Sequence, residues 1–385
     1  MDVAKIRAQI PVCRNVTYLN TGWSGPSPEP VLDAIKARVD YESAEGPTSK
    51  PVLDSGHEIE DDARQAVADL LNVTPDELCL TQNTTEGLNM VMAGFPWQEG
   101  DEIITFDIEH LSVMIPCLYA ERRHGVKVRV VELGTNDDWD TILNKIEAQM
   151  SPRTRMIAFS HIQFSCGLRM PLEGIRSLTR DKGVYMLVDG AQTPGHIALD
   201  LSGADVDFYS TPGHKWMLGP EGTGALFIKR EHVEMVQPSY VGHSAVDTEK
   251  SPLEFDLSGM GKFKVSTTSA ALAAGYRAAV GFINEAGPAD IEARNISLSN
   301  HLKAKLLERG NFDVLSPLEG PGLCGLTSFR AAGATSQEIV DRLWEDHGIV
   351  ARSVGGVDCV RVSSDFYNTE EELDRLMEAL AGIVS

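Results

Sequence analysis

Short apolar segments alternate with amphipathic segments along the chain from about residue 75. ELCLTQ, DEIITFDI and RMIAFSHI have the length of buried strands, and each precedes a segment with helical spacing of its apolar residues. Three more strand-like segments, VYMLVDG, VDFYST and GALFIKR, follow one another closely. This alternation predicts an α/β fold in which helices cover both faces of a mostly parallel sheet.

The pattern changes after about residue 262. A long Ala-rich helix, TSAALAAGYRAAVGFINEAG, and a second helix, DIEARNISLSNHLKAKLLERG, precede short strands and a last helical segment, TEEELDRLMEALAGIV. We therefore expect a large α/β domain over residues 20–262. A smaller α+β domain is expected over residues 263–385, joined by the N-terminal segment 1–19.

Charge and cysteine usage narrow the range of partners. The 385 residues include 34 basic and 56 acidic side chains, a formal net charge of -22 that repels phosphate backbones and anionic lipids. We expect neither nucleic acid nor a membrane as partner, and no metal site. The six cysteines are scattered without a CxxC pair, and the start MDVAKIRAQIPVC lacks the features of a signal peptide, so the sequence favours the cytoplasm.

Polar side chains follow several of the expected strands. Thr84 and Thr85 lie where a helix begins, a position that suits an anion but is also typical of a helix N-cap. Asp189 ends the strand YMLVD and needs a cationic partner, which a structural salt bridge would also supply. Gln192 follows it, and Lys215 lies in PGHKW after another strand, where burial can lower its pKa and a Schiff base can form.

These groups together suit pyridoxal phosphate. An anion site at a helix start can hold the phosphate, and Asp189 can keep the pyridine nitrogen protonated so that the ring accepts electrons. Gln192 can reach the phenolic oxygen, and Lys215 can bond the aldehyde.

The segments VDGAQ and GHKWMLGPEGTGAL resemble the class V aminotransferase family of fold-type I pyridoxal phosphate enzymes. This family includes cysteine desulfurases, isopenicillin N epimerases and cystine C–S lyases. The resemblance extends from TYLNTGWSGPSP to FYNTEEELDRL. It implies a seven-stranded, mostly parallel sheet between helices plus a smaller α+β domain, and it implies that Lys215 carries the cofactor.

The same resemblance implies roles for further residues. His110 matches the histidine that stacks on the cofactor ring, and His214 resembles part of the phosphate cradle with Thr84 and Thr85. Thr267 matches a residue that reaches the phosphate of a neighbouring subunit, which implies a homodimer with shared active sites.

Two positions depart from the family pattern. Pro212 stands where many relatives have a Ser or Thr that contacts phosphate, so Thr211 or Ser210 would have to supply the hydroxyl. The segment SHIQFSCG lacks the Asn of the desulfurases, and Phe164 could supply packing there.

Two arginines point to the reaction. Arg361 matches the family arginine that grips a substrate carboxylate, and Arg352 can assist it. Desulfurases place a nucleophilic cysteine on a loop in this region, whereas SVGGVD contains none and Cys359 fits a buried strand better. The chain most resembles the cystine C–S lyase branch. The features that carry this resemblance are the short connection between the two arginines, the arginines themselves and the segment YVGHSAV.

The resemblance to that branch implies β-elimination on a cysteine-type amino acid. Lys215 would remove the α-proton, the β-sulfur group would leave as a thiol or persulfide, and pyruvate and ammonia would follow. His110 could protonate the leaving group, and His243 could enter the neighbouring subunit's pocket or simply be solvated.

Three alternatives stay open. They are an amino-acid epimerase of the isopenicillin N epimerase type or another class V enzyme, a cysteine desulfurase without the usual loop cysteine, and an inactive cofactor-binding scaffold for a sulfur-transfer partner. A sulfur acceptor protein is a possible partner of the active forms.

Overall fold

The structure is a computed structural model, and it describes residues 1–135, 137–250, 252 and 254–384. Within these ranges no helix is both long and apolar enough to cross a membrane. The helices are α1 (Val3–Ala8), α2 (Glu29–Glu45), α3 (Lys50–Leu71), α4 (Thr84–Gly94), α5 (Leu111–His124), α6 (Trp139–Gln149), α7 (Leu172–Thr179), α8 (Ala270–Ala286), α9 (Pro288–Arg309), α10 (Ser336–His347) and α11 (Glu370–Ile383).

The described residues form a large seven-stranded sheet with the order β2-β8-β7-β6-β5-β3-β4. Its strands are β2 (Leu78–Thr81), β3 (Glu102–Phe106), β4 (Lys127–Val131), β5 (Thr154–Ser160), β6 (Tyr185–Asp189), β7 (Phe208–Pro212) and β8 (Gly224–Ile228). β8 runs antiparallel to both of its neighbours, and the pairs from β7 to β4 are parallel. The mostly parallel sheet expected from the sequence is confirmed.

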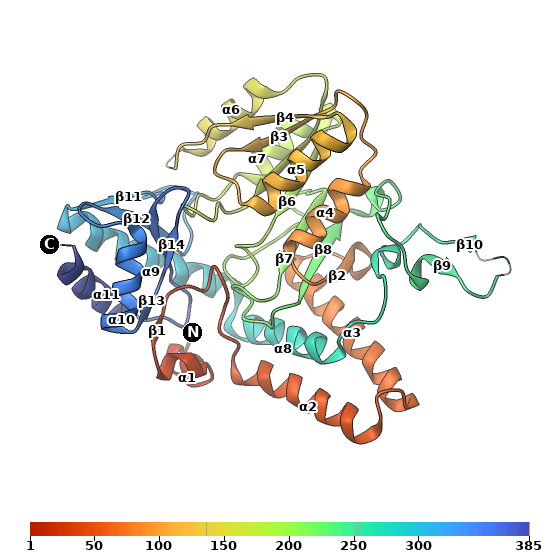
Figure 1. The fold of residues 1–385 in the computed structure, drawn as a ribbon, viewed down its shortest axis with the longest axis horizontal. Helices are drawn as coiled ribbons and strands as arrows, with labels where there is room; N and C mark the ends of the chain where they lie inside the picture. The colour runs from red at the N-terminus through yellow and green to blue at the C-terminus, as the bar shows by residue number, and fades with distance from the viewer. Residues whose placement is uncertain (136, 251, 253, 385) are drawn as a thin grey trace.

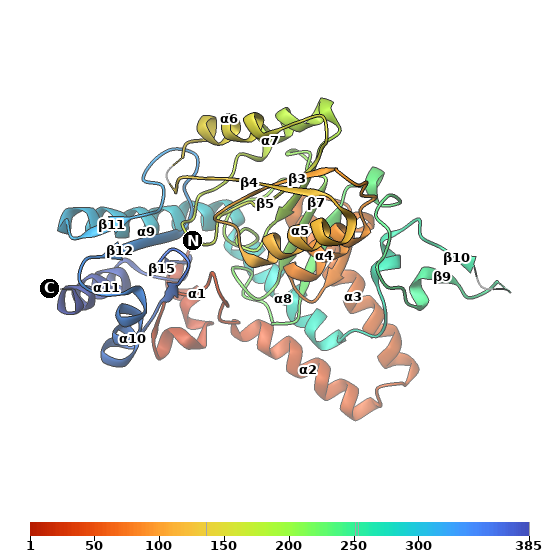
Figure 2. The same ribbon diagram turned by 45° about the horizontal axis from the view of Figure 1, so that its top comes forward.

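Helices cover both faces of this sheet because its strands are apolar on both sides. In β5, Ile157 and Phe159 face a core shared with α3, α6, α7 and α8, whereas Met156 and Ala158 face a core shared with α4 and α5. Figure 1 shows the sheet between these helices, and Figure 2 shows the same layers after a rotation. The alternation of side chains along each strand therefore builds two separate cores.

A smaller sheet lies at the C-terminal end, drawn in blue in Figure 1. It is antiparallel, with the order β11-β12-β15-β14, and its core is shared with α9, α10 and α11. Its strands are β11 (Phe312–Val314), β12 (Leu326–Ala331), β14 (Arg352–Val354) and β15 (Cys359–Ser363). Near it, β1 (Thr17–Tyr18) pairs in parallel with β13 (Ile349–Val350), so the N-terminal segment lies beside the C-terminal part.

The connection between the two sheets runs through α8 and α9. Tyr276 and Val280 of α8 belong to the core of the large sheet, so α8 packs with that sheet although it follows residue 262. The expected boundaries at residues 20, 262 and 263 stay a prediction. A separate hairpin of β9 (Val246–Asp247) and β10 (Glu254–Phe255) extends away from the body of the molecule in both ribbon views (Figures 1 and 2).

Candidate active site

A tight loop after β7 holds Lys215 at the end of the large sheet. The Gly219 N–H donates to the Gly213 carbonyl over 2.8 Å, and the Leu218 N–H donates to the Lys215 carbonyl over 2.9 Å. Leu218 has a φ of 58°, a strained value for a branched residue that its burial holds in place. A Cβ on Gly25 would lie 2.0 Å from the Lys215 carbonyl oxygen, so glycine is required there. The loop is thus held by its own backbone hydrogen bonds, and the N-terminal segment packs directly against it at Gly25.

Asp189 lies at the end of β6, next to β7, and is almost fully buried. Its Oδ1 accepts a 2.8 Å hydrogen bond from the Ala191 N–H. Burial raises the pKa of Asp189, while the positive charge of Lys215 opposes this shift. Burial also lowers the pKa of Lys215 to about 8, against the attraction of Asp189. The two groups act on each other at the carboxyl ends of adjacent parallel strands, where ligands of α/β folds bind.

His110 caps the N-terminus of α5. The Ser112 N–H donates to its Nδ1 over 3.1 Å, which leaves the hydrogen of the neutral ring on Nε2. The ring packs edge to face against Phe164 with centroids 4.9 Å apart. Burial, followed by the charges of Lys215, Arg352 and Arg361, lowers the pKa of His110 to about 4. His110 is therefore neutral at pH 7 and surrounded by cations.

The start of α4 packs directly against β7. Asn83 caps this helix by accepting from the Glu86 N–H, so the interpretation of Thr84 or Thr85 as the N-cap is wrong. The Ser210 hydroxyl donates to the Thr84 carbonyl over 2.9 Å, which uses its hydrogen and makes Ser210 a poor replacement for the hydroxyl lost at Pro212. The hydroxyls of Thr84 and Thr85 thus lie in the first turn of a helix whose free N–H groups suit an anion.

Arg361 and Arg352 face each other as register partners in β15 and β14. Arg361 is completely buried, yet the only hydrogen bond of its guanidinium within the described chain joins Nη1 to the Phe164 carbonyl over 3.0 Å. Burial, with a smaller effect of Arg352, lowers the pKa of Arg361 to about 9. A buried guanidinium without a carboxylate partner is costly, so the pair suits an anionic ligand that supplies the missing charge.

The structure brings most of the predicted residues together and leaves two apart. Five of them influence one another's charge state: His110, Asp189, Lys215, Arg352 and Arg361. Four others lie at the same strand ends and at the start of α4: Gln192, His214, Thr84 and Thr85.

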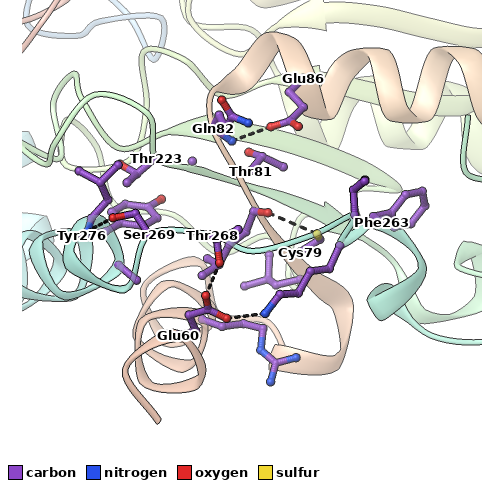
Figure 3. A pocket seen from close by; sticks show the side chains of 18 of the residues that line it. Glu60, Cys79, Thr81, Gln82, Glu86, Thr223, Phe263, Thr268, Ser269 and Tyr276 are labelled. Atoms are coloured by element: carbon purple, nitrogen blue, oxygen red, sulfur yellow. Dashed lines mark hydrogen bonds and ion pairs between the residues drawn. The ribbon is translucent and has the colours of Figure 1, made fainter. Parts of the chain in front are cut away.

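Thr267 and His243 are exposed and lie outside this cluster. Thr267 lines a separate cavity of about 500 Å³ between α3, β2 and α8, together with Thr81 and Thr223. Figure 3 shows this cavity, where Glu60 accepts hydrogen bonds from Lys264 and Thr268.

Sequence reasoning missed Trp23, whose ring lies under Arg352 with the guanidinium carbon 4.2 Å from its centroid. Such stacking orients a guanidinium without neutralising it. A tryptophan in a loop before the first long helix gives no periodic signal. Only its position in NTGWSG, beside a segment that folds back onto the site, could have suggested a role.

Comparison with known proteins agrees with this geometry. The family model for class V aminotransferases matches residues 17–376. The chain belongs to the class V aminotransferase family. Similar curated family members include an isopenicillin N epimerase of Streptomyces clavuligerus, 31% identical over 393 residues that cover 98% of each chain. A probable cysteine desulfurase of Methanothermobacter thermautotrophicus is 29% identical over 402 residues, which cover all of this chain and 98% of the relative.

The fold matches a solved family member closely. The cystine C–S lyase C-DES, in complex with its reaction product cysteine persulfide, superposes with a TM-score of 0.93 at 29% identity, covering 98% of this chain and 100% of the lyase. A lysine-to-alanine variant of C-DES carries glycine covalently linked to its pyridoxal phosphate (TM-score 0.91, 30% identity, covering 98% and 99%). The chain is a pyridoxal phosphate-dependent enzyme of the cysteine desulfurase and C–S lyase group.

The residues of the site fit this cofactor. His214 Nδ1, Arg352 Nε, and Nε and Nη2 of Arg361 are buried without a hydrogen-bond partner in the described part of the chain. These unused positions suit the oxygens of an anionic cofactor and substrate, and Asp189 and Lys215 supply a carboxylate and an amine of shifted pKa. When bound, pyridoxal phosphate supplies an electron-accepting ring that stabilises a carbanion at the α-carbon of an amino acid.

We expect capture of pyridoxal phosphate by cofactor-free protein to depend on pH in a characteristic way. Only the neutral amine attacks an aldehyde, so the capture rate rises about tenfold per pH unit and levels off above the Lys215 pKa of about 8 rather than above the ordinary 10.5. Stopped-flow absorbance measures this rate. A rate that keeps rising to pH 10 contradicts the shift.

The same shift affects stability with a defined sign. The pKa of Lys215 is lower in the folded protein than in the unfolded chain, so the unfolded chain binds more protons between about pH 8 and 10.5. Lys215 therefore makes the free energy of unfolding of the cofactor-free protein increase with pH across that window. Chemical denaturation at several pH values should show less of this rise in Lys215→Ala.

Proposed function

We propose that this enzyme is a C–S lyase that performs β-elimination on cysteine- or cystine-type amino acids and releases pyruvate, ammonia and a thiol or persulfide. The observation that carries this proposal is the pair of the half-buried Arg352 and the fully buried Arg361, whose charges act on Lys215, in a region where Cys166, Cys324 and Cys359 are buried. The similarity to a cystine C–S lyase supports it.

Each step is assigned to a residue of the site. Arg361 holds the α-carboxylate of the substrate with a planar fork, and Arg352, oriented by Trp23, holds the same carboxylate or the distal one of cystine. Lys215 would anchor the cofactor and then remove the α-proton. When the cofactor is bound, the Asp189 carboxylate would lie next to the pyridine nitrogen and hold a proton on that atom. Gln192 would donate to the phenolic oxygen.

His110 is suited to stabilise the leaving group. Its Nδ1 is used by Ser112, so the ring presents the Nε2 hydrogen, and burial, with a smaller effect of the nearby cations, keeps the ring from holding a second proton. A neutral imidazole is a very weak acid, so it would donate a hydrogen bond to the departing sulfur and stabilise its negative charge, while water supplies the proton. Thr84, Thr85 and His214 hold the phosphate.

Cys359 is not proposed as a nucleophile. It begins β15, is fully buried, and its Sγ lies 3.7 Å from the Ser165 carbonyl oxygen. Burial raises the pKa of this thiol, whereas a persulfide-forming cysteine needs an accessible thiolate.

We therefore expect Cys359→Ala to change the rate of pyruvate formation by less than about twofold. A coupled lactate dehydrogenase assay measures this rate. A large loss of activity without a loss of thermal stability would restore the cysteine desulfurase interpretation.

A panel of amino acids tests the function as a whole. Cystine, cysteine, alanine and a peptide-linked amino acid would each be incubated with the purified enzyme and scored for pyruvate, keto acid and inversion at the α-carbon. We expect pyruvate from cystine or cysteine. Inversion without pyruvate would instead support an epimerase, the alternative favoured by the 31% identity to an isopenicillin N epimerase, because that reaction uses the same α-proton without a leaving group.

We propose further that the enzyme works as a cytoplasmic homodimer with shared active sites. Thr267 and His243 are exposed and lie away from the Lys215 cluster of their own chain, as expected for groups that serve a partner. Leu111, Ile115 and Tyr119 form an exposed apolar face on α5 directly after His110. Sedimentation analysis tests the dimer, and a monomer would contradict it. A sulfur acceptor protein stays a possible partner.

A further inference from the structure

The Gln192 amide is held from both ends. The Trp216 indole N–H donates to its Oε1 over 2.7 Å, and its Nε2 donates to the Gly22 carbonyl over 2.8 Å. An indole can only donate and a carbonyl can only accept, so both contacts require the same orientation of the amide. One hydrogen of Nε2 remains available for a ligand.

Trp216 is itself locked in place. It is fully buried, and its ring stacks on His196 with centroids 3.6 Å apart and an interplanar angle of 11°. The Gly325 N–H donates to His196 Nε2 over 2.7 Å, so His196 carries its hydrogen on Nδ1 and donates it to the Gln192 carbonyl over 2.7 Å. The stack therefore ties the backbone and the side chain of Gln192 to the start of the small sheet.

His196 keeps this arrangement over a wide pH range. Burial is the main cause that lowers its pKa to about 3, and the charge of Arg169 acts in the same direction. Protonation would place a hydrogen on Nε2 opposite the Gly325 N–H, so the hydrogen bond requires the neutral ring. Above about pH 4 the platform under Trp216 is unchanged.

We propose that Trp216 is a positioning residue for the cofactor: its indole N–H fixes the orientation of the Gln192 amide, so that the free amide hydrogen is directed to the phenolic oxygen of pyridoxal phosphate. Without the indole N–H, only the contact to the Gly22 carbonyl holds the amide, so the amide can shift and direct its free hydrogen less well to the phenolate. This inference rests on the cofactor contacts proposed above and does not depend on the substrate.

The experiment is a spectrophotometric pH titration of the bound cofactor in the holoenzyme. A hydrogen-bond donor favours the phenolate with one proton less, so loss of the donor raises the pKa of the cofactor chromophore. We expect Trp216→Phe, which keeps an aromatic ring on His196, to raise the midpoint by roughly one pH unit. Gln192→Ala should give a similar rise, and the double variant should add little to either, because both changes remove one interaction.

Two further variants guard against a folding defect and a general effect of tryptophan loss. Gly22→Ala places a Cβ 2.9 Å from Gln192 Oε1, displaces the amide and should raise the midpoint in the same direction. Trp344→Phe, at an exposed position on α10, should leave the midpoint unchanged.

The outcomes separate this inference from the cofactor contact itself. A rise in Gln192→Ala without a rise in Trp216→Phe or Gly22→Ala overturns the positioning role alone. Additive rises in the double variant do the same. An unchanged midpoint in Gln192→Ala overturns both the contact and the positioning role.

Discussion

Replacement of Lys215 by alanine is expected to lower pyruvate formation from cystine by about 10³-fold or more, because one change removes both the cofactor anchor and the base. The fold should survive. Burial already disfavours the charged form of this lysine, and the loop around it is closed by backbone hydrogen bonds that do not involve the side chain.

Two measurements check this expectation. One is the coupled pyruvate assay, and the other is the mass of the protein after borohydride reduction in the presence of pyridoxal phosphate, which should show an adduct in the wild type and none in Lys215→Ala. Lys182→Ala, at an exposed position, is the matched control and should behave as the wild type. Retained turnover without Lys215 contradicts the assignment of the base.

Replacement of Arg361 by methionine is expected to separate binding from stability. Loss of a bidentate contact to the substrate carboxylate should raise KM by about 10²-fold, since hydrogen bonds to charged groups contribute about 1.5–3 kcal/mol each. The cofactor-free variant should be at least as stable as the wild type, because the change removes a completely buried guanidinium that forms no ion pair with a described residue.

Steady-state kinetics and thermal unfolding of the cofactor-free protein test both parts. Arg342→Met, which breaks an exposed ion pair on α10, is the control and should leave KM unchanged. If Arg361→Met leaves KM unchanged and unfolds at a much lower temperature, Arg361 is a structural residue and the carboxylate is bound elsewhere.

The sheet and much of the candidate site could be predicted from local patterns. Short apolar strands such as β3 and β5 each precede an amphipathic segment, and this pattern leaves few alternatives to a parallel sheet with helices on both faces. The polar residues after these strands meet at one edge because parallel strands end there. Their chemistry then follows from residue type.

The helix start at residue 84 shows where local reasoning was wrong. Thr84, Thr85 and Asn83 are all good capping residues, and the sequence does not decide between them. In the folded protein Asn83 is the cap, because its side chain accepts from the Glu86 N–H. The Thr84 carbonyl accepts from the Ser210 hydroxyl where α4 approaches β7 at Gly87, a contact between segments that are distant in sequence.

The sequence by itself determined the α/β class, because this depends on periodicity. It also predicted the lysine and the carboxylate from the chemistry of single side chains, and the arginines through the resemblance to the family. Only the tertiary structure decided that Arg361 is buried without a carboxylate partner among the described residues, that Trp23 lies under Arg352, and that the Trp216 indole donates to Gln192. These are contacts between segments far apart along the chain or rotations of a single amide. No local pattern records them, since burial and hydrogen-bond geometry arise only when the segments pack together.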